Sequence, residues 1–273
     1  LHLDDAMTLA LERQPSVLQA RALTEAASGR VEQARSGFLP QVTGSAIAEI
    51  VHGRPTTQST PTSAGSVPQG TYDVFSVGVS GTQLIYDFGQ TLDRTRAASE
   101  SRDAQKSAER TTTVQVALQV RQAFFQAHAQ KALVRVGQET VANQERHLAQ
   151  IQGFVGQGIR PEIDLAQART DLANSRVTLI NARTSYATAR AQLNQAMGVF
   201  GPANYEVADD DLGAVPGEDQ SADRLLPAAI AARPEIATLK QEQRASELTL
   251  SSIRGAYGPT LSAVGGVSEA GVS

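Results

Sequence analysis

The residues that could do chemistry are few and far apart in this sequence. It contains no cysteine, which excludes disulfides, thiolate catalysis and cysteine-ligated zinc. The four histidines lie near the start of the chain, in a loop-like stretch and in one helical stretch: His2, His52, His128 and His147. The last two are 19 residues apart, more than five helical turns, so they cannot share a metal ion within one chain. We therefore expect no metal site, no cofactor, no catalytic residue and no enzymatic activity.

A close pair of carboxylates, Glu162 and Asp164, is the remaining candidate for acid–base chemistry. Both follow a break between residues 153 and 161 that holds three glycines and a proline, and a new helix is expected to begin there. Acidic side chains in the first turn of a helix are stabilised by the helix dipole. We therefore interpret this pair as a feature of a helix start.

The composition excludes further classes of function. The 24 Lys and Arg residues against 28 Asp and Glu give a net charge of −4, so no basic field is available to attract nucleic acid. Aromatic residues make up only 4% of the 273 residues and tryptophan is absent, whereas a compact enzyme core of this size normally contains more large rings. No stretch approaches the roughly 20 apolar residues of a membrane-spanning helix. This composition is typical of long helices that pack closely together.

Two segments, residues 39–51 and 72–86, alternate between apolar and polar side chains and predict strands. One face of the first would carry Val42, Gly44, Ala46, Ala48 and Ile50, and one face of the second would carry Phe75, Val77, Val79 and Ile85. Asp73 and Gln83 interrupt the apolar face near the ends of the second strand. The segment between the strands, residues 53–70, is rich in Gly, Pro, Ser and Thr and predicts an exposed loop.

Helical patterns cover most of the remaining chain. Residues 3–36 predict two helices that meet near Gln14 and Pro15, because proline disfavours helix at the residue before it. From residue 89 a helical pattern continues for about 65 residues, and after the break at 153–161 a second long helix reaches about Met197.

Both long helices carry apolar or small residues at every seventh position. In the first these are Val120, Ala127, Val134, Val141, Leu148 and Val155, with a second seam at Leu118, Phe125 and Ala132. In the second they are Leu165, Leu172, Leu179, Tyr186 and Leu193, with small residues such as Ala168 and Ala189 three positions later. Large residues at one position and small ones at the other allow close packing. The pattern predicts an antiparallel coiled-coil hairpin with its tip at residues 153–164.

The opening pattern returns after an irregular, acidic connection. A shift of 219 residues without gaps aligns Pro15 with Pro234 and Pro40 with Pro259, so the helix break and the strand entry coincide. We expect six segments: N-terminal helices (1–38), a strand pair (39–88), the helical hairpin (89–198), an irregular surface connection (199–222), the helices of a second repeat (223–257) and the start of its strand (258–273). We further expect the natural polypeptide to continue with a second strand pair and a second long hairpin.

Four short stretches occur in a specific order along the chain. They are a helix with a Gln-Pro step at 9–15 (LALERQP), a helix-to-strand junction at 38–41 (FLPQ), a strand-to-helix junction at 83–89 (QLIYDFG) and a hairpin turn at 158–165 (GIRPEIDL) followed by Ala168. In this order and spacing they resemble the TolC-type outer-membrane efflux protein family. One position departs from the family pattern: Pro161 stands where Ser or Thr is common, which removes a usual helix N-cap.

The resemblance implies a mainly α fold with a β-barrel part. A long antiparallel coiled-coil helical hairpin and outer-membrane β-strands would form a trimeric α/β-barrel tunnel, with residues 53–70 as a candidate extracellular loop. Such a homotrimer would be the passive exit duct of a tripartite efflux pump or a type I secretion system, exporting small molecules or polypeptides. It would lie in the lipid of the outer membrane of a Gram-negative bacterium and extend into the periplasm.

The resemblance also implies partners and site residues. An inner-membrane pump would supply the energy, and the hairpin tip would dock a periplasmic adaptor (membrane fusion) protein. The candidate docking residues are Gly156, Gly158, Ile159, Arg160, Pro161, Glu162 and Asp164. The two glycines also have a plain structural interpretation, as turn glycines that permit positive φ.

The alternative interpretation is a coiled-coil scaffold or adaptor that binds partners in the periplasm without forming a channel. The duct requires residues 39–51 and 72–86 to be strands with apolar faces toward lipid, because open strand edges are not stable in a membrane. A scaffold would make them loops or a small soluble sheet. A protein that needs detergent and migrates as a trimer would favour the duct.

Overall fold

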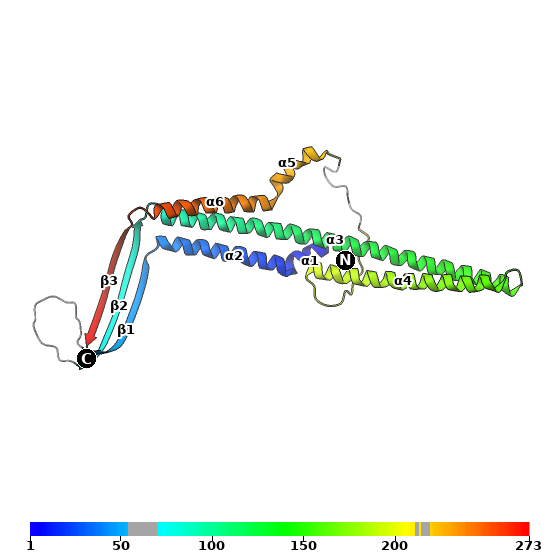
Figure 1. Ribbon diagram of the computed structural model, residues 1–273, viewed down its shortest axis with the longest axis horizontal. Coiled ribbons are helices and arrows are strands. Elements are labelled where there is room, and N and C mark those ends of the chain that lie inside the picture. Colours follow the sequence, from blue (N-terminus) through cyan, green and yellow to red (C-terminus); the bar gives the residue numbers. More distant parts are fainter. Residues whose placement is uncertain (54–69, 211–212, 214–218, 273) are drawn as a thin grey trace, which may run out of the picture. The chain divides into compact units, whose positions relative to one another are not determined.

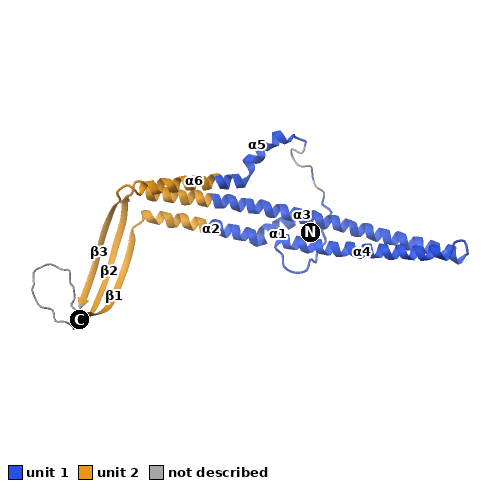
Figure 2. Ribbon diagram, in the orientation of Figure 1, with its two compact units in different colours: residues 1–25, 104–239 blue, residues 26–103, 240–273 orange. Residues whose placement is uncertain are grey.

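The computed structural model describes residues 1–53, 70–210, 213 and 219–272. The chain divides into two compact units, residues 1–25 with 104–239 and residues 26–103 with 240–273 (Figure 2). In chain order the elements are α1 (Leu3–Arg13), α2 (Pro15–Arg35), the short 3-10 helix η1 (Ser36–Phe38), β1 (Gln41–Gly53), β2 (Gly70–Tyr86), α3 (Gln90–Gly156), α4 (Glu162–Met197), α5 (Ala222–Ala232), α6 (Pro234–Gly255) and β3 (Leu261–Val272) (Figure 1). The predicted fold class, mainly α with a strand part, is confirmed.

The three strands form one antiparallel sheet in the order β1-β2-β3. The pairing of β1 with β2 runs without a shift from Gln41 opposite Thr82 to Gly53 opposite Gly70. Gly53 and Gly70, the first and last residues of the predicted loop, are therefore strand residues. Residues 54–69 of that loop lie outside the described residues. Strand β3 pairs with β2, and among the described residues neither β3 nor β1 has a partner at its other edge.

The register gathers apolar residues of all three strands on one face of the sheet, around Phe75, Val77 and Val79. The separation is incomplete, because Ile47 and Val264 lie on the other face and Glu269 lies on the first, opposite Val77. Residues directly opposite each other in an antiparallel pair share a face. Ala48 lies opposite Phe75, and Val79 lies opposite Gly44 of β1 and Val267 of β3. These side chains are uncovered in the single chain, with exposed fractions of 57% for Phe75 and 79% for Val267. The sheet therefore presents an apolar face with no partner from the described part of the chain.

The long helix α3 begins at a buried cap in the unit that contains the sheet. The Asp87 carboxylate, buried beside the strand end, accepts a hydrogen bond from the Thr91 N–H at 2.7 Å. A carboxylate at this position satisfies a helix N–H that has no partner inside the helix. Phe88 and Gly89 provide the turn between strand and helix with φ of 54° and 83°.

The hydrophobic core of the other unit lies where α1, α3, α4 and the chain after α4 meet. Its largest fully buried side chains include Phe124, Leu193, Met197 and Val207. On α4 the heptad prediction is confirmed, because its buried residues include Ala168, Leu172, Leu179, Ala189 and Leu193.

On α3 the first predicted seam is buried at Val120 and Ala127, but the second seam is wrong at Leu118, which is 55% exposed. Val116 and Phe124 are buried instead, four residues on either side of Val120. Residues four apart share a face of a helix, whereas a residue two positions away points to the opposite side. The core face of α3 is therefore set by this spacing.

The internal repeat is reproduced in the helices. Shifted by 219 residues, the bounds of α1 become those of α5, and the start of α2 becomes the start of α6. Both breaks have the same form: Gln14 and Arg233 are extended, with φ/ψ of −66°/120° and −73°/116°, and a proline follows each. No helix in the described part of the chain combines the length and the apolar character needed to cross a membrane.

Candidate functional site

The hairpin tip, residues 153–164, is a tight turn built on one glycine. The Gly158 N–H donates to the Val155 carbonyl at 2.9 Å, and the Ile159 N–H donates to the Phe154 carbonyl at 2.9 Å. This pair of bonds is the Schellman arrangement at a helix end, and it needs a left-handed residue. Gly158 supplies it with φ of 72°. Gly156 was expected to share this role, but it is the last residue of α3 and is not among the positive-φ glycines.

Helix α4 begins after Pro161 without a side-chain cap. Pro161 is extended, with φ/ψ of −74°/154°, and its carbonyl accepts the Asp164 N–H at 3.1 Å. Glu162 and Asp164 lie in the first turn, where the helix dipole favours negative charge. The Asp164 carboxylate also lies 3.4 Å from the Arg160 guanidinium. Asp164 thus has an ionic partner, and both carboxylates lie where the helix dipole stabilises them.

The surface of the tip combines exposed apolar side chains with one arginine. Ile159 and Ile163 are 65% and 71% exposed, and Phe154 is 44% exposed. Ile159 is among the candidate docking residues expected from the sequence, whereas Phe154 and Ile163 are not. The signal that could have found them is their position off the heptad seam, where an apolar residue has no partner inside the hairpin. The tip is therefore an apolar, solvent-facing surface that the described chain leaves uncovered.

The histidines are engaged in ordinary polar contacts or exposed. His2 faces Asp210, His52 lies 2.7 Å from the Thr71 hydroxyl, His128 lies near Asp209, and His147 is exposed. Within the described ranges, no group of three or more histidine and acidic side chains is arranged to hold a metal ion.

A second ordered region, which we call the strap, is formed by residues 199–210. The sequence analysis described residues 199–222 as an irregular surface connection. The strap is irregular, but it is not confined to the surface, because Val207 is 1% exposed and belongs to the core. The Arg190 guanidinium donates to the carbonyls of Ala203 and Tyr205 at 3.1 and 3.0 Å, and the Tyr205 hydroxyl donates to Asn194 at 2.7 Å. Side chains of α4 therefore hold the strap in place.

Tyr205 is buried enough to change its ionisation. Burial raises the pKa of its hydroxyl to about 12, although the Arg190 guanidinium acts in the opposite direction. A polar group removed from water favours its neutral form. The raised pKa keeps Tyr205 protonated above its ordinary value of 10.0, so its hydroxyl can still donate to Asn194 in mildly alkaline solution.

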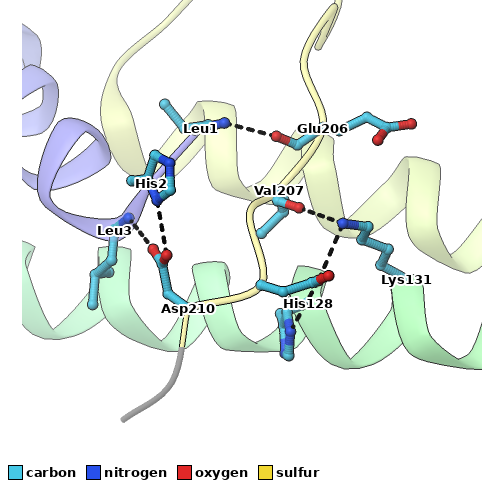
Figure 3. Close-up of polar contacts among 9 residues, drawn as sticks. Leu1, His2, Leu3, His128, Lys131, Glu206, Val207 and Asp210 are labelled. Carbon is cyan, nitrogen blue, oxygen red and sulfur yellow. Dashed lines mark hydrogen bonds and ion pairs between the residues drawn. The ribbon is translucent and has the colours of Figure 1, made fainter. Parts of the chain in front are cut away.

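The end of the strap meets α1 and α3 in a cluster of polar contacts (Figure 3). Asp210 accepts the Leu3 N–H at 2.8 Å and lies 2.8 Å from His2 Nδ1. The Lys131 ammonium donates to the Val207 carbonyl at 2.8 Å and to the Asp209 carboxylate at 3.1 Å. Neither motif nor periodicity identifies these contacts in the sequence, because they join residues about 80 and 200 positions apart.

The chain thus combines a long helical hairpin with a strand sheet that has an uncovered apolar region. A scan against protein-family profiles matches residues 6–199 to the family "Outer membrane efflux protein". The chain therefore belongs to the outer membrane efflux protein family, as the sequence resemblance predicted. Its predicted localisation, the outer membrane of a Gram-negative bacterium with an extension into the periplasm, is that of the family.

Solved structures of similar fold agree with this assignment. The chain is 19% identical to CusC, with a TM-score of 0.77, covering 98% of this chain and 60% of CusC. It is 18% identical to the Campylobacter jejuni CmeC outer membrane channel (TM-score 0.75; 99% and 60% covered) and 15% identical to the outer membrane protein VceC of Vibrio cholerae (TM-score 0.74; 99% and 67% covered). At these identities the likeness shows the fold. A search among curated proteins found no significant match.

Proposed function

We propose that this chain forms the outer-membrane exit duct of a tripartite export system, as a homotrimer that carries out no chemistry of its own. The chain spans 60–67% of the three solved relatives, so this function is proposed for the protein of which the two units form a part. The single observation that carries the proposal is the apolar, uncovered face of the three-stranded sheet in a chain of this family.

The sheet supports a membrane barrel through its edges as well as its face. Strands β1 and β3 each have one edge without a partner in the part of the chain that the structure describes. Unpaired backbone groups cost several kcal/mol each in lipid, so an open three-stranded sheet cannot be stable there. Pairing with further strands removes these edges, and barrel closure removes them all.

Exposed apolar residues on the long helices support the proposal that further helices surround the hairpin. Leu133 and Val136 of α3 are 53% and 55% exposed, and Val177 and Ile180 of α4 are 56% and 60% exposed. These residues lie off the seam that joins α3 to α4. Uncovered apolar residues along both helices favour contacts with further helices on each side, as in a tube.

The tip supports docking of a periplasmic adaptor protein. Exposed Ile159 and Ile163 offer an apolar anchor flanked by the charged side chains of Arg160, Glu162 and Asp164, which suits a protein interface. The adaptor would couple the duct to an inner-membrane pump that supplies the energy. A passive duct can export either small molecules or polypeptides. The proposal therefore includes both drug efflux and type I secretion.

The experiment that tests the duct is purification of the intact gene product from membranes. The proposal expects a detergent-dependent trimer by light scattering and ion conductance in planar bilayers. A detergent-free monomer without conductance would contradict it and favour the coiled-coil scaffold.

The docking role is tested separately by binding of the cognate adaptor. Replacing Ile159 and Ile163 by Asn is expected to weaken binding, whereas Asn174→Asp, an exposed change farther along α4, is expected to leave it unchanged. If the variant with Asn at positions 159 and 163 bound the adaptor as strongly as Asn174→Asp, the docking role would be contradicted. The duct proposal would be unaffected by that result.

A further inference from the structure

The strap ends in two neighbouring carboxylates that reach different elements (Figure 3). Asp210 Oδ2 accepts the Leu3 N–H at 2.8 Å, and its other oxygen lies 2.8 Å from His2 Nδ1. Asp209 turns to α3, with its Oδ1 at 3.1 Å from the Lys131 ammonium and 3.4 Å from His128 Nε2. One short segment therefore contacts both the start of α1 and the middle of α3.

Asp210 provides a hydrogen-bond acceptor at the start of α1 that the residues of this helix do not provide. Leu3 is the first residue of α1, so its N–H has no acceptor within the helix. His2 stands at the N-cap position and makes no side-chain cap hydrogen bond. The Asp210 carboxylate supplies the missing acceptor, and its negative charge is favoured at a helix N-terminus.

Backbone hydrogen bonds fix the strap beside the same residues. The Leu1 nitrogen donates to the Glu206 carbonyl at 2.8 Å, and the Ala208 N–H donates to the Leu1 carbonyl at 3.0 Å. Between them, Val207 is buried in the core. The two carboxylates that follow are thereby carried to fixed positions at the helix start and on α3.

We propose that Asp210 is the N-terminal cap of α1, supplied by the strap, and that Asp209 and Asp210 form a two-part ionic clasp that orders α1 against α3. Asp210 is the positioning residue for α1, whereas Asp209 holds the strap to α3 through Lys131. The clasp is independent of the exported substrate and of the membrane part, so it does not rest on the proposed function.

The charges around the clasp determine its response to pH. Lys131, His128 and Arg135 of α3 face Asp209, and the Lys131 hydrogen bond is the main cause that lowers the pKa of Asp209. His2 faces Asp210, and the Leu3 N–H is the main cause that lowers the pKa of Asp210, followed by the hydrogen bond with His2. A carboxylate with a lowered pKa stabilises the folded contact above its ordinary value of 3.8 and loses that effect as the pH falls through the lowered value.

The clasp is tested by hydrogen exchange and mass spectrometry on the intact protein at neutral pH. In Asp210→Ala, exchange in the first turn of α1 is expected to accelerate about threefold to thirtyfold, as for loss of a helix cap. Asp210→Asn keeps an acceptor oxygen and is expected to restore part of the protection. In Asp209→Ala, the strap is expected to exchange faster while the first turn of α1 stays protected.

Glu139→Ala, which removes an exposed carboxylate of α3 outside the strap, is the charge control and is expected to change neither segment. Unchanged protection of α1 in Asp210→Ala would overturn the capping role. Equal loosening of α1 by Asp209→Ala and Asp210→Ala would overturn the division between the two carboxylates.

Discussion

At the scale of single residues, two glycines end the two long helices in the same way. Gly198, like Gly158, is left-handed, with φ of 70°, and its N–H and that of Val199 bond back to α4 as in the Schellman arrangement. Their surroundings differ. A Cβ on Gly158 would meet nothing within 4 Å, whereas one on Gly198 would lie 2.9 Å from the Arg13 carbonyl and the Gln14 backbone. The end of α4 therefore approaches the α1–α2 break as closely as a glycine allows.

Gly198→Ala is expected to destabilise the protein by at least about 1–2 kcal/mol, the cost of a left-handed alanine, with the close contact at Gln14 in addition. Chemical denaturation followed by circular dichroism measures the change. Gly153→Ala is the matched control: Gly153 is helical with open space around it, so alanine is expected to stabilise α3 by about 0.5–1 kcal/mol.

Tyr205 gives a prediction in alkaline solution. Its folded pKa of about 12 exceeds the ordinary value of 10.0, so the strap contact contributes fully below pH 10 and is lost as the pH rises toward 12. Absorbance titration of the tyrosinate is expected to show one of the five tyrosines ionising late. That late step should be absent in Tyr205→Phe, and its persistence there would assign it to another residue.

At the scale of elements, the seam of the hairpin was partly predictable. The seven-residue spacing identified the core face of α4, because large and small residues alternate there without interruption. On α3 it failed at Leu118, since apolar residues lie on both faces of that helix and only the packing of Val116, Val120 and Phe124 distinguishes them. The breaks at Pro15 and Pro234 were predictable because a local steric rule sets them.

Phe124→Ala is expected to destabilise the protein by about 3–5 kcal/mol, because it empties a fully buried site between α1, α3 and α4. Leu118→Ala, on the exposed side of the same helix, is expected to change the free energy of unfolding of the unassembled chain by less than about 0.5 kcal/mol. Urea unfolding in detergent compares the two variants. A cost for Leu118→Ala equal to that for Phe124→Ala would place the core on the other face of α3.

The candidate sites were also predictable from the sequence only in part. The turn at Gly158 was predictable, because a glycine between two long helices has a local explanation. The strap was not, because Asp210 and Leu3 are 207 positions apart and their contact depends on tertiary packing. The exposure of Ile163 likewise depends on which face α4 turns toward α3.

At the scale of the whole molecule, the proposed contact with the membrane depends on the apolar residues of the sheet. Val79 and Ser80 are neighbours in β2, at nearly the same height on the sheet, but they lie on opposite faces. Val79 lies beside Val267 of β3 on its face, whereas Ser80 lies between Thr43 and Gly266 on the other, so a charge at the two positions should have different consequences for a barrel in lipid.

Val79→Lys is expected to cost about 2–4 kcal/mol of membrane stability if this face contacts the lipid core, whereas Ser80→Lys is expected to be tolerated. The fraction of protein recovered as folded trimer from outer membranes measures the difference. Equal recovery of the two variants would contradict a lipid-facing role for the apolar face.

The pairing of β2 with β3 also orders the events of folding. Tyr86 pairs with Leu261, so the long hairpin and the second pair of helices lie between two strands that touch. Contacts within the hairpin and between β1 and β2 close short loops, whereas the β2–β3 pairing closes a very long one and forms more slowly. We therefore expect β2 to keep an open edge until β3 pairs with it, and we expect the folding chain to be most prone to aggregation before that pairing forms.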